Sequence, residues 1–367
     1  MNQRVVATIN RKALLHNFAV AKTHAHGSKL VAVIKANAYG HGLLPVAETL
    51  QDADLFGVTD LAEAEILRAG GTDKDILILQ GIIDRNEIAR CARQGFQLVI
   101  HSPDQLHWLE AALDNISLPK PLVFWLKLDT GMHRLGIAPT DCNTICSKLL
   151  AKPWTKNVVL MTHLANASEP QSPLNAMQLQ QFHTCINSHD KPPLAASIAA
   201  SAALLALDCK SNWVRPGLML YGSSPFLWRD IQRRREAFNL QAVMTLQARL
   251  IAIKDIAAGS SVGYNSQFIS TTPMRIGIVS IGYADGYPSN TPNGAPVMVS
   301  GTRTTTVGRV SMDMLAIDLT HIPQALVGDV VRLWGDEISL DEVAAHTGIL
   351  SYNLTCSISA RVAREYI

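Results

Sequence analysis

Residues 29–42 read KLVAVIKANAYGHG, a nearly continuous apolar run that ends in a lysine and a turn containing two glycines. Its first part, residues 29–36, is typical of a parallel strand covered on both faces. Seven similar runs follow, with helical patterns such as LAEAEILRAG between them, at 55–60, 76–80, 98–102, 123–129, 158–164, 195–201 and 213–222. Eight strands with interleaved helices favour a closed (β/α)8 barrel over an open doubly wound sheet. The seventh run is alanine-rich and also fits a helix.

After residue 225 the pattern changes. The stretch FLWRDIQRRREAF at 226–238 indicates a solvated connector, and from about residue 237 short strands alternate with Gly, Pro, Asn and Asp. One helix is expected at LDEVAAHTG, residues 340–348. We therefore expect two domains, a barrel over 1–236 and a mainly β domain over 237–367.

The composition excludes several classes of protein. The 367 residues are 48% hydrophobic and 17% charged with a net charge of +2, which leaves no strong field for nucleic acid or anionic membranes. The N-terminus, MNQRVVATINRK, has no hydrophobic leader and no apolar run reaches membrane-spanning length, so we expect a cytoplasmic protein. The six cysteines form neither a disulfide framework nor a zinc pattern, and we expect no metal.

Polar residues gather where the predicted barrel strands end, which is where barrel enzymes place their active sites. Lys35 follows an apolar strand, so it is either a buried amine of lowered pKa or a lysine that emerges into water. The other strand ends carry Lys127, Arg134, His163, Ser201 and Arg215. Cations with serine and glycine amides suit a phosphorylated, anionic ligand. The P-loop, dinucleotide and zincin motifs are absent from the sequence.

Seven motifs give the chain a resemblance to bacterial alanine racemases, which join a (β/α)8 barrel to a β domain and use pyridoxal 5'-phosphate (PLP). The motifs, in order, are AVIKANAYGHG (32–42), LKLDTGMHRLG (126–136), THLANA (162–167), WVRPGLMLYG (213–222), VGYNSQF (262–268), IGYADGYP (281–288) and VGRVSMDM (307–314). In VGYNSQF, Asn265 stands where many members of the family have glycine.

The resemblance implies a role for each matching residue. Lys35 matches the lysine that attaches PLP covalently as an internal aldimine. Arg134 matches the arginine at the pyridoxal phenolic oxygen and substrate, His163 the imidazole against the ring, and Arg215 the arginine at the pyridine nitrogen. The positions that match cofactor-phosphate contacts are Tyr39, Ser201, Gly217, Leu218 and Tyr352.

Racemisation removes a proton from one face of Cα and returns one to the other, so it needs two groups. The resemblance implies that Lys35 acts on the D-alanine proton and Tyr264 on the L-alanine proton. It places Tyr264, Tyr283 and Met312 in the partner's active site, the last two at the substrate carboxylate, which implies a homodimer with shared sites. It also implies that Lys127 is carbamylated to N6-carboxylysine and pairs with Arg134. An unmodified Lys127 beside Asp129 or a bound anion is the alternative.

Three other classes of protein remain open: a related PLP-barrel decarboxylase or broad-specificity racemase, a single-barrel PLP carrier, and a sugar-phosphate barrel enzyme. Arg215 opposes the decarboxylases, which place an acidic residue at the pyridine nitrogen, and the β domain opposes the carrier. We expect interconversion of L- and D-alanine, either to supply D-alanine for peptidoglycan or to degrade it. The breadth between alanine and serine stays open.

Overall fold

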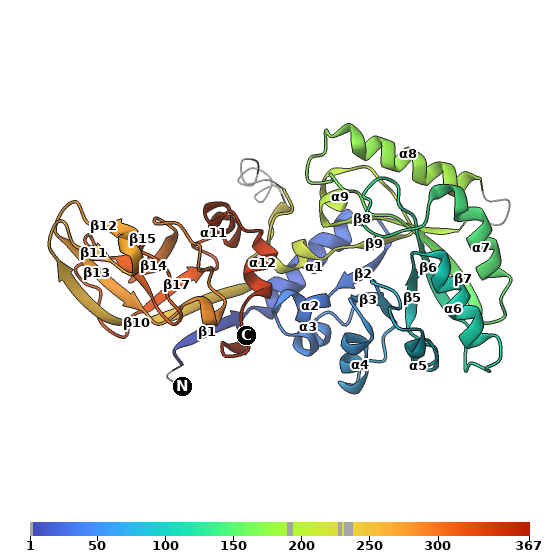
Figure 1. Cartoon of the computed structure of the whole chain (residues 1–367), viewed down its shortest axis with the longest axis horizontal. Helices are drawn as coiled ribbons and strands as arrows, with labels where there is room; N and C mark the ends of the chain where they lie inside the picture. The colour runs from blue at the N-terminus through green and yellow to red at the C-terminus, as the bar shows by residue number, and fades with distance from the viewer. Residues whose placement is uncertain (1–2, 189–193, 227–229, 231–237) are drawn as a thin grey trace.

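The computed structural model describes residues 3–188, 194–226, 230 and 238–367, and it places a barrel beside a β domain (Figure 1). The connector expected at 226–238 and the boundary expected at 236/237 fall largely on residues outside this description. The structure therefore shows both domains, and the exact boundary between them stays a prediction.

Eight parallel strands close into a barrel in chain order, and the first pairs with the last through Lys29–Trp213 and Leu30–Val214. The (β/α)8 prediction is confirmed, including the alanine-rich seventh strand. The strands are β2 (Lys29–Val33), β3 (Leu55–Val58), β4 (Ile76–Ile78), β5 (Gln97–Ile100), β6 (Leu122–Lys127), β7 (Thr155–Met161), β8 (Ala195–Ala200) and β9 (Trp213–Arg215).

The continuous apolar pattern arises because both faces of each strand are buried. In β2, Val31 points into a cluster inside the barrel, whereas Leu30 and Ala32 pack outward under the helices. The inner cluster also contains Leu55, Leu77, Val99, Trp125, Val159 and Met161. This filled interior confines any ligand to the open end of the barrel.

Helices surround the barrel (Figure 1). They are α1 (Arg11–His24), α2 (Lys35–Tyr39), α3 (Leu43–Thr49), α4 (Leu61–Ala69), η1 (Arg85–Glu87), α5 (Ile88–Gln94), α6 (Pro103–Leu113), η2 (Pro139–Asp141), α7 (Cys142–Leu150), α8 (Pro173–Asn187), α9 (Ser201–Ala206) and η3 (Leu218–Tyr221).

All eight barrel strands end before the residue predicted, and two of these early ends shape the site. The strand expected at 29–36 ends at Val33 and passes into α2, and the strand expected at 213–222 ends at Arg215. Pro216 lacks a backbone N–H for the sheet, and Gly217 then begins the 3-10 turn η3. Both early ends lie at the barrel mouth, where the backbone turns toward the site.

The second domain contains an eight-stranded sheet in the order β13-β16-β15-β14-β17-β10-β1-β18. The predicted strands and the predicted helix α11 are present. The sequence analysis missed β1, β18 and the helix α12; β1 precedes the barrel yet pairs with β10 and β18. The elements are β1 (Val5–Ile9), β10 (Met244–Ile256), β11 (Ser261–Val262), η4 (Tyr264–Ser266), β12 (Phe268–Ile269), β13 (Met274–Val279), η5 (Tyr283–Asp285), β14 (Pro296–Val299), β15 (Thr302–Val307), β16 (Leu315–Asp318), β17 (Val330–Trp334), α11 (Leu340–Thr347), α12 (Ser351–Cys356) and β18 (Ala363–Tyr366).

Candidate active site

Lys35 begins a turn of unusual hand at the end of β2. The next four residues, 36–39, all have φ between 52° and 54°, and Gly40 follows at 83°. Each left-handed non-glycine residue costs roughly 1–2 kcal/mol, so the surrounding structure must hold this turn. Arg364 of β18 donates to the Gly40 carbonyl at 2.7 Å, and a side chain on Gly40 would collide with the Thr355 carbonyl of α12. The C-terminal segment therefore fixes the backbone that carries Lys35.

A carboxylate from α4 ties the same turn to the barrel. Glu63 accepts hydrogen bonds from the backbone N–H groups of Asn37, at 3.0 Å, and Thr59, at 2.8 Å. Sequence reasoning missed Glu63, although it stands three residues after Asp60, the N-cap of α4, where a capping glutamate is common.

The ammonium of Lys35 lies in an unfavourable environment. Burial lowers the pKa of Lys35, and the charge of Arg134 lowers it further, while Glu63 opposes the shift. The lowered pKa favours the neutral amine, which is the form that attacks a carbonyl or accepts a proton. The structure therefore does not support a lysine that simply emerges into water.

Lys127 ends β6 and is buried, with 8% of its surface exposed. Burial, followed by the charges of Arg215, Arg134 and Lys35, lowers the pKa of Lys127 to about 8. The charge of Asp129 partly opposes this shift, but its carboxylate accepts the backbone N–H groups of residues 131–133 and forms its ion pair with His133. Among the described residues no carboxylate forms an ion pair with Lys127, so an unmodified ammonium here has several like charges around it.

His163 lies among the same cations. Burial lowers the pKa of His163 well below its usual value, and Arg215, Lys127, Arg134 and Lys35 each lower it further. The imidazole is therefore neutral near pH 7. Because four cations all lower the pKa of His163, the five predicted side chains lie close together at the barrel mouth.

Arg215 is buried and fixed by neutral oxygen atoms. It donates to the Ser197 hydroxyl and to the carbonyls of Thr162, at 2.6 Å, and Ile198, at 3.1 Å. Burial lowers the pKa of Arg215 to about 10, so it stays charged at neutral pH. Among the described residues, Arg215 forms no ion pair with a carboxylate. Sequence reasoning missed Ser197, because a serine in an alanine-rich strand gives no distinctive signal.

The predicted phosphate residues form a cradle beside Lys35. The Ser201 hydroxyl accepts hydrogen bonds from the N–H groups of Gly217, at 3.0 Å, and Met219, at 3.3 Å. A Cβ on Gly217 would lie 2.6 Å from the Tyr39 hydroxyl, so glycine is what lets this hydroxyl approach the turn. The Tyr39 ring stacks on Tyr221 with centroids 4.7 Å apart. Leu218 follows in η3, and Tyr352 is half-exposed on α12, which packs against α2.

A cofactor with a phosphate fits these residues. The polar groups of the cradle are the Ser201 and Tyr39 hydroxyls beside the η3 backbone, and the neighbouring cations form no ion pair with a carboxylate among the described residues. An amine of lowered pKa for covalent attachment stands at the edge of this cradle. These residues are therefore suited to bind an anionic ring compound that is attached covalently to Lys35.

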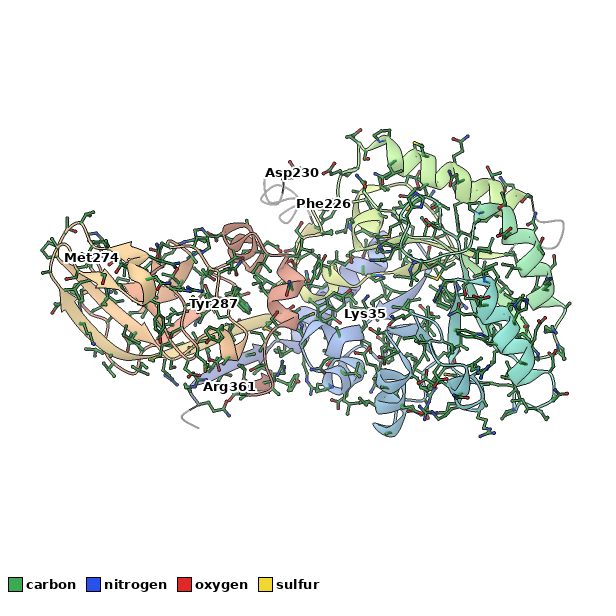
Figure 2. All side chains as sticks on the ribbon, in the orientation of Figure 1. Lys35, Phe226, Asp230, Met274, Tyr287 and Arg361 are labelled. Atoms are coloured by element: carbon green, nitrogen blue, oxygen red, sulfur yellow. The ribbon has the colours of Figure 1, made fainter. Side chains whose placement is uncertain are left out.

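The remaining predicted residues lie elsewhere. Tyr264 in η4 is 67% exposed, Tyr283 in η5 is 45% exposed, and Met312 is 53% exposed, all in the β domain. Figure 1 shows β11 and β12, which flank η4, at the outer end of this domain, well away from α2. In Figure 2, Met274 of β13 marks that end, and Lys35 lies across the domain junction. The folded chain therefore does not bring Tyr264 to its own Lys35.

Two negative findings concern the described part of the chain. None of its helices is long and apolar enough to cross a membrane. Among the same residues, no three or more His, Cys, Asp or Glu side chains gather into a group that could hold a metal ion.

Fold and site together define a two-domain barrel enzyme with a cation-lined mouth. Family models for the alanine racemase N-terminal and C-terminal domains match residues 9–225 and 243–366. The chain belongs to the alanine racemase family, in the racemase class of enzymes. This membership sets aside the decarboxylase, carrier and sugar-phosphate alternatives.

Individual relatives agree over the full length. The chain is 44% identical over 365 residues to a catabolic alanine racemase of Pseudomonas putida, with 98% of each chain covered. It matches the crystal structure of the biosynthetic alanine racemase from Pseudomonas aeruginosa with a TM-score of 0.93 and 42% identity, covering 100% of this chain and 99% of that one. It also matches an alanine racemase from Bartonella henselae that carries covalently bound pyridoxal phosphate, with a TM-score of 0.90, 27% identity and full coverage of both chains.

Proposed function

We propose that this chain interconverts L- and D-alanine as a PLP-dependent homodimer, with Lys35 and Tyr264 as its two bases. The observation that carries the proposal is the buried group at the barrel mouth: an amine of lowered pKa, three further cations and a neutral imidazole beside an anion cradle. Such a group has a chemical purpose only when an anionic cofactor and substrate neutralise it.

The cofactor contacts follow from the donor set. The Bartonella relative carries covalently bound pyridoxal phosphate, and Lys35 stands where this chain can make that bond. When bound, PLP acts as an electron sink that makes the substrate's Cα–H acidic. Ser201 and the η3 backbone hold the phosphate, and Arg134 binds the phenolic oxygen. Arg215 stays charged and has only donors, so it keeps the pyridine nitrogen unprotonated.

Two proton-transfer groups are needed, and one chain places only one of them at the barrel mouth. Lys35 accepts or donates the proton on the face used by D-alanine. The exposed Tyr264 serves the opposite face of a partner's site, because it is remote from Lys35 in its own chain. Tyr283 and Met312 accompany it and contact the substrate carboxylate. These roles require two copies of the chain in an isologous dimer.

Lys127 has a structural part in this proposal. The neutral amine of Lys127 attacks CO2 and releases a proton, which forms a carbamate on its nitrogen. This anion replaces a buried cation and relieves the repulsion from Arg215, Arg134 and Lys35. That anion pairs with Arg134 and orients it toward the phenolic oxygen. We therefore assign Lys127 as N6-carboxylysine.

The physiological direction has two candidates, supply of D-alanine for peptidoglycan and catabolism of D-alanine. Relatives of similar identity carry each role, so overall similarity does not decide between them. Deletion of the gene distinguishes the two: a requirement for added D-alanine supports supply, and loss of growth on alanine as carbon source supports catabolism.

The proposed function is tested by borohydride reduction of the purified protein, peptide mapping and a racemisation assay with L-alanine. We expect a pyridoxyl label on Lys35 and conversion to D-alanine. Lys29→Ala is the matched control, since Lys29 is an exposed lysine at the opposite end of the same strand; it should retain label and activity. A label on another lysine, or no racemisation by cofactor-loaded protein, would overturn the proposal.

A further inference from the structure

A buried carboxylate lies beneath the residues proposed to meet the substrate. Asp285, in η5, is completely buried. It pairs with Arg4 and with the Arg361 guanidinium, at 3.1 Å, and accepts the Gly282 backbone N–H at 3.0 Å. The three partners come from the start of the chain, the segment before β18, and the turn that contains Tyr283. One carboxylate thus joins three distant segments.

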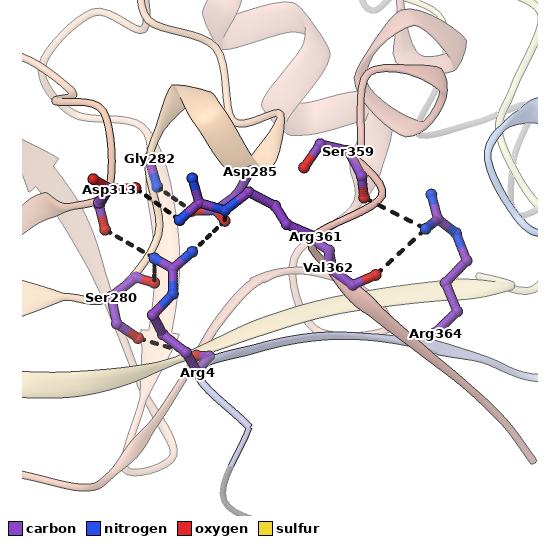
Figure 3. Close-up of polar contacts among 9 residues, drawn as sticks. All are labelled: Arg4, Ser280, Gly282, Asp285, Asp313, Ser359, Arg361, Val362 and Arg364. Carbon is purple, nitrogen blue, oxygen red and sulfur yellow. Dashed lines mark hydrogen bonds and ion pairs between the residues drawn. The ribbon is translucent and has the colours of Figure 1, made fainter.

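The two arginines extend this cluster to a second turn. Arg4 also donates to the carbonyls of Ser280, at 2.7 Å, and Asp313, at 3.2 Å, and Arg361 donates to the Asp313 carboxylate at 2.8 Å. Figure 3 shows both guanidinium groups converging on Asp285 between these turns. We call Arg4, Ser280, Gly282, Asp285, Asp313 and Arg361 the Asp285 cluster.

Backbone hydrogen bonds join the turns directly. The N–H of Tyr283 donates to the Ser311 carbonyl at 3.0 Å, and that of Ala284 donates to the Met312 carbonyl at 2.9 Å. Gly282 has no room for a side chain against the same carbonyls. The turns that carry Tyr283 and Met312 therefore form a single unit, and the Asp285 cluster surrounds its base.

We propose that Asp285 is a positioning residue that aims Tyr283 and Met312 at the substrate carboxylate in the partner's active site. The inference rests on the proposed function, which assigns Tyr283 and Met312 to that carboxylate. Because both side chains are about half exposed in their own chain, the backbone beneath them largely determines their direction. Without the Asp285 charge, the Arg4 and Arg361 guanidinium groups repel each other and the joined turns loosen.

The test is Asp285→Asn, assayed in both directions. Tyr283 and Met312 bind substrate and transition state alike, so we expect the KM of both isomers to rise about tenfold with kcat changed less than about threefold. The absorbance of bound cofactor should be unchanged, because the cluster does not contact the Lys35 turn. An unchanged KM in the folded variant would overturn the proposal.

Glu337→Gln is the matched control. Glu337 forms an ion pair with Arg332 in the same domain, outside the cluster, and the substitution also turns a carboxylate into an amide. Its KM should equal that of the wild type. If Asp285→Asn does not fold, Arg361→Gln replaces it, because Arg361 is partly exposed and Arg4 still pairs Asp285. A smaller rise in KM supports the proposal, and no rise contradicts it.

Subunit mixing separates an effect on the partner from an effect within the chain. In a heterodimer of Asp285→Asn with Lys35→Ala, the one site with Lys35 receives Tyr283 and Met312 from the chain with intact Asp285. We expect that site to have the wild-type KM. A raised KM would show that Asp285 acts on its own chain, through the segment whose Arg364 binds Gly40, and would overturn the proposal. Mixing Lys35→Ala with Tyr264→Phe tests the shared site itself.

Discussion

The barrel mouth and the outer face of the β domain present their functional groups in opposite ways. At the barrel mouth, Lys127, His163 and Arg215 are buried or nearly so, and the charges of Lys127 and Arg215 lower the pKa of His163. On the β domain, Tyr264 and Met312 are more than half exposed. One region gathers buried cations and an imidazole within a single chain, whereas the other presents exposed side chains remote from that group.

This difference indicates that the barrel mouth and the β domain have different tasks. A buried cation cluster must be built by rigid elements, because each charge needs fixed partners to tolerate loss of water. In the proposed function, substrate enters and leaves at the edge between the barrel mouth and the surface contributed by a second copy. The comparison therefore predicts that defects in the two regions complement each other between chains.

The largest expected effect tests this complementation. Lys35→Ala and Tyr264→Phe should each be nearly inactive, and mixing them under subunit exchange should restore activity. Random exchange of equal amounts makes half of the dimers mixed, each with one intact site, so about a quarter of the wild-type rate should return. Native mass spectrometry measures the exchange. No recovery in demonstrated heterodimers would mean that both bases act within one chain.

A large but asymmetric effect is expected from Tyr264→Phe alone. Loss of one acid–base group typically slows a reaction about 10²–10⁴-fold, so racemisation should fall by this amount. Lys35 remains to exchange the Cα proton of D-alanine with deuterium oxide, and that exchange should survive better than exchange from L-alanine. NMR of each isomer measures both rates. Equal losses from the two isomers would contradict a two-base arrangement.

The same contrast explains what the sequence could predict. The eight apolar runs predicted the barrel, because parallel strands buried on both faces have a strong local signal. Three of these runs contain Lys35, Lys127 and Arg215, which predicted the position of the barrel mouth. The sequence did not predict β1 and β18, since their partners lie more than 200 residues away or in the opposite terminus. Ser197 and Glu63 were missed for a similar reason: their function arises from tertiary contacts.

An intermediate effect is expected at Lys127. Lys127→Ala removes the proposed anion and leaves Arg134 unpaired, so kcat/KM should fall about tenfold or more, a loss of about 1.4 kcal/mol in transition-state stabilisation. Acetate, which fits the vacated anion site, should restore part of the activity. Lys156→Ala, an exposed lysine at the start of the neighbouring strand β7, is the control and should not respond to acetate. Full activity without any carboxylate would show that no anion is needed here.

A smaller effect, on the unfolding free energy, should distinguish a carbamate on Lys127 from a free amine. An unmodified Lys127 with a pKa of about 8 binds fewer protons when folded than when unfolded, where its pKa is about 10.4. Its contribution to stability therefore rises with pH between about 8 and 10.4, by roughly 3 kcal/mol at most. A carbamate binds no proton in this range. The unfolded lysine carries no carbamate and binds a proton below about pH 10.4. The difference in unfolding free energy between wild type and Lys127→Met should therefore rise with pH only above about 8 in CO2-free buffer, and already below about pH 8 in bicarbonate. A difference that stays flat below about pH 8 in both buffers would exclude the carbamate.

The smallest effect is expected beside Tyr264, where Asn265 stands at the position that is glycine in many relatives of the family. Asn265 has φ = 58°, a left-handed conformation that glycine and asparagine adopt at a lower cost in free energy than alanine. Asn265→Gly should therefore change the unfolding free energy by only a few tenths of a kcal/mol, whereas Asn265→Ala should cost about 1 kcal/mol. Because Tyr264 is exposed, its alignment depends on this backbone, so the alanine variant should also lose more racemisation than the glycine variant. Thermal unfolding and initial rates measure both. If alanine were tolerated as well as glycine, the conformation of this loop would not be what aligns Tyr264, and the exposed face of the β domain would depend on the partner subunit for its shape.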